Sequence, residues 1–130
     1  MKKTFFIVQL FTTLSLSFFG SVNAFAGSLI IEVPDNPKPT TETIVYQCDT
    51  GTSKERVEAI YHNADNIALV DFKWKGNRII GSNVIAASGA KYVGGPYVWW
   101  TKRNEASFYN LISDPNEEKP IHCIEEKGTE

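Results

Sequence analysis

Residues 56–77 read RVEAIYHNADNIALVDFKWKGN, a pattern typical of two consecutive β-strands. The first run alternates apolar with polar side chains, which predicts a strand with one buried face. It stops at Asn63-Ala64-Asp65-Asn66, and a second run covers Ile67–Trp74. Lys75-Gly76-Asn77 then predicts a hairpin turn. Because these links are too short for a crossover connection, the strands are expected to pair antiparallel.

Short β-rich runs of the same kind recur on both sides of this segment. No segment has a sustained helical stripe of apolar residues at i, i+3 and i+4, so helices are not expected to dominate. The sequence predicts an all-β antiparallel domain of seven or eight strands, built as a small barrel or a sandwich. The expected strands are Thr43–Cys48, Arg56–His62, Ile67–Trp74, Arg78–Ile80, Val84–Ala87, Tyr97–Lys102, Glu105–Asn110 and Ile121–Glu125.

Residues 1–26 have the pattern of a secretory signal peptide, with small residues that predict cleavage after Ala24 or Ala26. The apolar run, residues 5–19, is shorter than the ~20 residues that a membrane-spanning helix needs. The first cysteine is Cys48, so no lipid-attachment cysteine is expected directly after the leader. These features predict an exported, periplasmic protein without a stable membrane anchor.

The remaining chain is expected to comprise an extended, proline-containing tail over residues 27–42, a β domain over residues 43–126 and a short tail over residues 127–130. The whole chain carries 13 basic and 15 acidic residues, and without Lys2 and Lys3 the balance is 11 against 15, a net charge of −4. This charge argues against a nucleic-acid partner. A chain of 130 residues also excludes large catalytic folds such as the (β/α)₈ barrel, which needs roughly 250 residues.

Cys48 and Cys123 are the two cysteines of the chain. In an oxidising compartment two cysteines are expected to pair, and a small exported domain commonly needs such a crosslink. The alternative is a metal site that combines them with His62 and His122. Because the close-spaced ligand pairs of zinc sites are absent from the sequence, a disulfide is the preferred interpretation and no metal is expected.

Catalytic motifs are weakly represented. Ser88-Gly89-Ala90-Lys91 matches the S-x-x-K pattern of penicillin-binding enzymes, but that chemistry needs a helical turn and a much larger fold. The chain lacks a nucleophile elbow, a zinc-protease motif and a phosphate-binding loop. The sequence therefore predicts a protein that is not an enzyme and needs no cofactor.

Residues 87–102 combine small, aromatic and basic residues in the order ASGAKYVGGPYVWWTK. Val93–Pro96 is predicted to form a turn, and a strand follows. Alternation places Tyr97, Trp99 and Thr101 on one face of this strand and Val98, Trp100 and Lys102 on the other. Because the two tryptophans cannot face the same core, we expect Trp99 to lie on an outer face or to cap a barrel mouth.

The order Ser88-Gly89-x-x-Tyr92 followed by Trp99-Trp100-Thr101-Lys102 resembles the signature of the bacterial inhibitors of c-type lysozyme, which include membrane-bound and periplasmic proteins. The resemblance extends over most of the chain after the leader. Further matches are Tyr46-x-Cys48-Asp49-x-Gly51, Asn66-Ile67-Ala68-Leu69, Glu105-Ala106 and Cys123.

The resemblance implies an eight-stranded antiparallel β-barrel that inhibits c-type lysozyme and protects the bacterial cell wall. In that family the signature loop enters the lysozyme cleft, and its serine and lysine contact the catalytic carboxylates. Carried over to this chain, these residues are Ser88 and Lys102. Gly89 would let the backbone approach closely, and Tyr92 and Thr101 would add supporting contacts.

Two points qualify the match. Arg103 stands where the family commonly has a glycine directly after the motif lysine, and the proline-containing tail has no counterpart in the family core. The absence of a lipid-attachment cysteine favours the soluble periplasmic branch. The residues alone also permit a periplasmic carbohydrate-binding module that stacks exposed Tyr and Trp rings on sugars, and they leave both a monomer and a homodimer open.

Overall fold

A computed structural model describes residues 27–34 and 38–128, so the predicted leader lies outside the described residues. The chain divides into two units, and the strands belong to the second, Glu32–Glu130. Within the described ranges, no helix is long and apolar enough to cross a membrane. The strands are β1 (Thr40–Asp49), β2 (Lys54–Ala64), β3 (Ile67–Trp74), β4 (Asn77–Val84), β5 (Ala90–Gly94), β6 (Tyr97–Lys102), β7 (Glu105–Asn110) and β8 (Ile121–Glu125).

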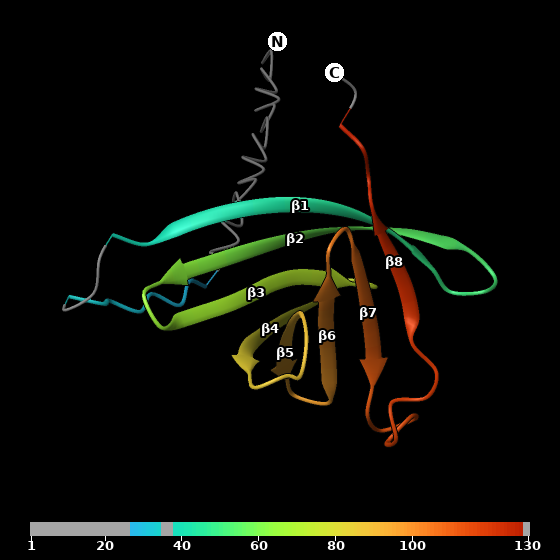
Figure 1. The fold of residues 1–130 in the computed structure, drawn as a ribbon. Helices are drawn as coiled ribbons and strands as arrows, with labels where there is room; N and C mark the ends of the chain where they lie inside the picture. The colour runs from blue at the N-terminus through green and yellow to red at the C-terminus, as the bar shows by residue number, and fades with distance from the viewer. Residues whose placement is uncertain (1–26, 35–37, 129–130) are drawn as a thin grey trace, which may run out of the picture. The chain divides into compact units, whose positions relative to one another are not determined.

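The strands form a closed antiparallel barrel in which each strand pairs with the next and β8 returns to pair with β1 (Figure 1). This confirms the predicted eight-stranded barrel and decides between the barrel and the sandwich. The strands β1 to β4 have at least 8 residues each, whereas β5 to β8 have 5 or 6. The first strand begins at Thr40 rather than at the expected Thr43.

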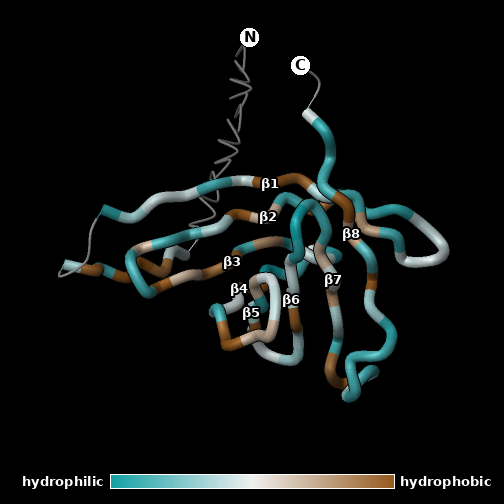
Figure 2. Tube along the Cα trace, in the orientation of Figure 1, coloured by the Kyte–Doolittle hydropathy of each residue, from teal (hydrophilic) through white to brown (hydrophobic). Residues whose placement is uncertain are grey.

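The alternation predicted for β2 is confirmed. Val57, Ala59 and Tyr61 are buried, whereas Glu58 between them is exposed. Figure 2 shows this alternation of apolar and polar residues along the strands, with the β2–β3 turn strongly hydrophilic. The turn after β3 consists of Lys75 and Gly76, both with positive φ, as the twist of a tight hairpin requires.

One expected strand is wrong. Residues Val84–Ala87 do not form a separate strand, because Val84 ends β4 and residues 85–89 form the loop to β5. The side chain of Ile85 is fully exposed, so its apolar character does not reflect burial. The turn expected at Val93–Pro96 is also shorter, since β5 continues to Gly94. A Cβ on Gly94 would lie 2.1 Å from the carbonyl oxygen of Ile80, so glycine allows β4 and β5 to approach each other there.

Trp99 lies inside the barrel, which corrects the expectation of an outer or capping position. Its side chain is 1% exposed, and its ring packs against Phe72 at a centroid distance of 4.7 Å and edge-on against Tyr46 at 5.2 Å. The indole N–H donates a 2.9 Å hydrogen bond to the Tyr61 hydroxyl, which shares a 2.8 Å bond with the Tyr46 hydroxyl. The core accepts the tryptophan because its polar atom has a partner there.

Cys48 and Cys123 form the predicted disulfide. They face each other directly across the β1–β8 pairing, and both are buried. This pairing covers only Tyr46–Asp49 against His122–Glu125. The crosslink therefore joins the first and the last strand where their pairing closes the barrel.

Because the Tyr61 phenol is buried, we expect the folded protein to lose stability at alkaline pH. Burial, with a further contribution from the Tyr46 hydrogen bond, raises the pKa of Tyr61 well above its ordinary value. The unfolded phenol ionises above pH ~10 while the folded one stays neutral, so its contribution is complete below pH ~10 and decreases as pH rises, by up to about 1.4 kcal/mol per pH unit.

We expect Tyr61→Phe to lower the free energy of unfolding by about 1–3 kcal/mol at neutral pH, because the buried Trp99 N–H loses its acceptor. The same variant should lose less additional stability than wild type between about pH 8 and pH 11. Urea unfolding at the two pH values measures both effects. Equal alkaline losses in the two proteins would contradict the assigned role of the Tyr61 phenol.

Candidate functional site

The loop between β4 and β5 packs directly against the end of β6. Gly89 has φ +66, and a Cβ at this position would lie 2.1 Å from the Thr101 carbonyl oxygen and 2.8 Å from Lys102 Cγ. Only glycine fits both the backbone conformation and the contact. The close approach brings the exposed residue Ser88 beside the strand that carries the exposed residue Lys102. These two predicted site residues therefore lie on one exposed surface of the barrel.

Trp100 connects the loop and the strand. Its indole N–H donates a 2.8 Å hydrogen bond to the Ser88 carbonyl oxygen, and the Lys102 ammonium lies 4.7 Å from its ring centroid. Trp100 is absent from the predicted site residues, although the alternation in β6 already places it on the same face as Lys102. That shared face is the signal in the sequence that could have identified it.

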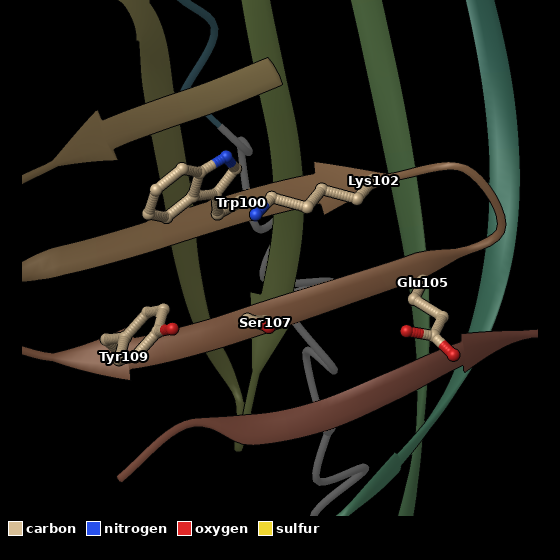
Figure 3. Close-up of a pocket in the computed structure, with 5 residues that line it drawn as sticks. All are labelled: Trp100, Lys102, Glu105, Ser107 and Tyr109. Atoms are coloured by element: carbon tan, nitrogen blue, oxygen red, sulfur yellow. The ribbon is translucent and has the colours of Figure 1, made fainter. Parts of the chain in front are cut away.

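A pocket opens on the outer face of β6 and β7 beside these residues (Figure 3). In the close-up, the Lys102 side chain runs along β6 towards Trp100, while the Glu105 carboxylate points away from the ammonium. Lys102 and Glu105 are direct neighbours across the β6–β7 pairing. The lining residues are Trp100, Lys102, Glu105, Ser107 and Tyr109.

The charge of Lys102 is not neutralised within the described part of the chain, where no carboxylate lies within ion-pair distance of its ammonium. A second ammonium, that of Lys91, lies 4.9 Å from the centroid of the same Trp100 ring. It forms a 3.0 Å ion pair with Glu117 from the β7–β8 connection. Of these two lysines, Lys102 is the one whose charge is available to an outside carboxylate.

Tyr92 and Thr101 lie away from this surface. Tyr92 is 7% exposed and belongs to the barrel core, where its ring lies 5.8 Å from that of Tyr61. Burial raises the pKa of the Tyr92 phenol. The half-buried Thr101 donates a 3.3 Å hydrogen bond to the Ala90 carbonyl oxygen across the β5–β6 pairing. The structure thus brings Ser88, Gly89 and Lys102 together on the surface. Tyr92 lies in the barrel core, and Thr101 is half-buried beside β5.

Arg103 begins the β6–β7 turn with φ +56. This left-handed conformation favours glycine, because a side chain there is strained. The departure from the family pattern therefore falls at a position whose backbone conformation glycine adopts more readily than arginine.

The surface that carries Ser88 and Lys102 presents a hydroxyl and an ammonium, and these two groups can recognise carboxyl groups in either protonation state. Among the residues that the structure describes, no group of three or more His, Cys, Asp or Glu side chains could hold a metal ion. His62 makes a 3.7 Å contact with Asp71 on the barrel surface, apart from the cysteines that form the disulfide.

Comparisons with known proteins agree with these features. Residues 46–117 match the family described as membrane-bound lysozyme-inhibitor of c-type lysozyme. Two proteins named membrane-bound lysozyme inhibitor of C-type lysozyme are similar in sequence. The one from Pseudomonas aeruginosa is 37% identical over 79 residues, and the one from Cupriavidus necator is 36% identical over 78 residues. The alignments cover 61% and 60% of this chain, and the same shares of the two relatives.

A solved structure is also similar, that of Pseudomonas aeruginosa MliC in complex with hen egg white lysozyme. The similarity has a TM-score of 0.65 at 29% sequence identity, and it covers 78% of this chain and 99% of the solved one. The relatives are named as inhibitors rather than as enzymes. Because the family match spans more than half of the residues, the chain belongs to the family of membrane-bound lysozyme inhibitors of c-type lysozyme.

Proposed function

We propose that this chain inhibits c-type lysozyme by placing Ser88 and Lys102 in the active-site cleft of the enzyme. The observation that supports this most strongly is the close approach of Gly89 to Thr101 and Lys102, which brings the Ser88 loop beside the end of β6. Among the described residues, no carboxylate pairs with the Lys102 ammonium at this strand end. The solved relative was crystallised in complex with a c-type lysozyme.

The two groups suit the target. Lysozyme is a retaining glycosidase, and such enzymes hold two catalytic carboxyl groups about 5 Å apart, one protonated and one ionised. The Lys102 ammonium can pair with the ionised carboxylate, and the Ser88 hydroxyl can accept from the protonated acid or donate to its carboxylate form. A barrel bound in this way blocks the wall polysaccharide without any covalent step.

The test is a titration of the purified protein, freed of its leader, into hen egg-white lysozyme while the clearing of a bacterial wall suspension is followed. We expect clearing to stop near a one-to-one ratio of the two proteins. Full clearing at an excess of the barrel would contradict the proposal. A parallel pull-down on wall glycan tests the carbohydrate-binding alternative, which is less favoured because two ammonium groups already lie against the Trp100 ring.

We further propose that the protein acts in the periplasm as a soluble protein. The predicted leader, the lack of a cysteine directly after it and the Cys48–Cys123 disulfide support this location. Fractionation of cells that express the full chain tests it. Release with the periplasmic contents on osmotic shock is expected, and retention in the membrane fraction would contradict it.

We expect Gly89→Ala to weaken inhibition about tenfold or more, because the added Cβ forces the Ser88 loop away from Thr101 and Lys102 and costs a charge-assisted contact. Gly51→Ala is the matched control. Gly51 also has positive φ, +88, but nothing lies within 4 Å of an added Cβ. Inhibition constants of the two variants are compared, and equal values would show that separating the loop from β6 is irrelevant.

A further inference from the structure

Trp100 makes the side-chain hydrogen bond that holds the Ser88 loop. Its N–H donates to the Ser88 carbonyl oxygen at 2.8 Å, and among the described residues no other side chain donates to residues 85–89. The loop has no regular strand pairing of its own. The position of the Ser88 hydroxyl therefore depends on the indole.

The same side chain also holds Lys102. A lysine at an exposed strand end has a flexible stem, and ordering it on binding costs conformational entropy. The ammonium of Lys102 lies 4.7 Å from the Trp100 ring centroid, within the range of a cation–π interaction. Figure 3 shows the stem extended along β6 with the ammonium beside the ring. The ring thus preorganises the charge before any partner arrives.

Lys91 would disturb this arrangement if its charge were not balanced. Its ammonium lies 4.9 Å from the centroid of the same ring, so two positive charges lie around one indole, and like charges repel each other. Glu117 pairs with Lys91 at 3.0 Å, and both side chains are partly buried. The ion pair leaves the net positive charge at the ring with Lys102.

We propose that Trp100 is a positioning residue that fixes Ser88 through its N–H and Lys102 through its ring, so that both groups are presented together. The effect of Trp100 on lysozyme inhibition rests on the proposed function, whereas its contacts with Ser88 and Lys102 do not. The contact with Lys102 can therefore be tested in the free protein, and the effect on inhibition is tested with the enzyme.

The first test is NMR of the free protein with isotope-labelled lysines. A lysine side chain held over an indole experiences the ring current of the indole. The chemical shift of the Lys102 Cε protons is therefore expected upfield of that of the exposed Lys73. In Trp100→Leu they should move to the position of Lys73. Identical resonances for the two lysines in the wild-type protein would overturn the proposal, and this measurement needs neither a variant nor lysozyme.

The second test uses inhibition. Trp100→Phe keeps a ring but loses the N–H and is expected to weaken inhibition roughly threefold, and Trp100→Leu, which loses both contacts, roughly tenfold or more. The matched controls are Trp74→Phe and Trp74→Leu, because Trp74 also has a lysine near its ring, with Lys75 at 5.7 Å. Controls that lose as much inhibition as the Trp100 variants would point to general destabilisation and overturn the proposal.

A double-mutant cycle separates positioning from a structural role. If Trp100 acts partly through Lys102, Trp100→Leu must cost less inhibition in a Lys102→Ala background than in wild type. Fully additive losses would overturn the ring-mediated part. If the wild-type barrel does not inhibit lysozyme at all, the proposed function fails, whereas the resonance test still decides whether Trp100 positions Lys102.

Discussion

Replacing Lys102 with alanine is expected to weaken lysozyme inhibition by about 2 kcal/mol or more, which is roughly thirty-fold. The variant removes the ammonium that is expected to meet an ionised catalytic carboxylate. The enzyme carboxylate would then be covered by the barrel without a partner, and a buried unpaired charge is costly. Lys102→Met, which keeps much of the stem and removes only the charge, should lose nearly as much.

The matched control for this change is Lys75→Ala. Lys75 also lies near a tryptophan ring, that of Trp74, and its removal changes the net charge by the same amount. Any general loss of electrostatic attraction to a basic enzyme will therefore appear in both variants. Inhibition constants measured at one salt concentration are compared. An unchanged constant for Lys102→Ala, or equal losses in both variants, would contradict the role given to Lys102.

Removing the disulfide is expected to have the largest effect on stability. The crosslink spans a sequence separation of 75 residues, for which the chain-entropy relation gives a stabilisation of about 4.5 kcal/mol. A small domain has a total stability of only about 5–15 kcal/mol. The double variant Cys48→Ala/Cys123→Ala should therefore lose between about a third and nine tenths of its free energy of unfolding.

Urea unfolding of the double variant and of wild type, the latter with and without a reducing agent, measures this effect. Reduced wild type should resemble the double variant, which separates the loss of the crosslink from the loss of two buried side chains. The β1–β8 seam should open first, because only Tyr46–Asp49 and His122–Glu125 pair there. A decrease in unfolding free energy of less than about 1 kcal/mol in both cases would contradict the role assigned to the disulfide.

The fold could be predicted well where local pattern and tertiary packing agree. The alternation in β2 and the turn at Lys75 and Gly76 are local properties, and both are confirmed. The strand expected at Val84–Ala87 is wrong because β-rich composition alone does not show burial, as the fully exposed Ile85 illustrates. The sequence does not predict the strand β5, because the residues at its two ends, Ala90 and Gly94, are small and resemble those of a turn.

The position of Trp99 could not be predicted from alternation. Alternation divides the residues of β6 between two faces but does not say which face is inside. That choice depends on the pairing of Trp99 with Tyr92 and Phe108 and on an acceptor, the Tyr61 hydroxyl, that is 38 residues away in sequence. The interior face is thus fixed by contacts that no single strand contains.

The residues of the candidate site could also be predicted from the sequence only in part. The resemblance to a known family supplied Ser88, Gly89 and Lys102, and the structure brings them together. It also supplied Tyr92, whose ring is in the core, because a motif records which residues recur and not which of them face solvent. The proposed role of Trp100 depends on the orientation of its indole and on the conformation of the Lys102 side chain. Neither can be read from the order of the residues.

The mode of inhibition tests the central claim most directly. Hydrolysis of a soluble chitin oligosaccharide by hen egg-white lysozyme is measured over a range of substrate concentrations at several concentrations of the barrel. A protein that occupies the cleft with Ser88 and Lys102 competes with substrate, so the apparent KM should rise linearly with free inhibitor while kcat stays constant. A kcat that falls at constant KM, or rates that do not respond to the barrel, would show that it does not act at the cleft.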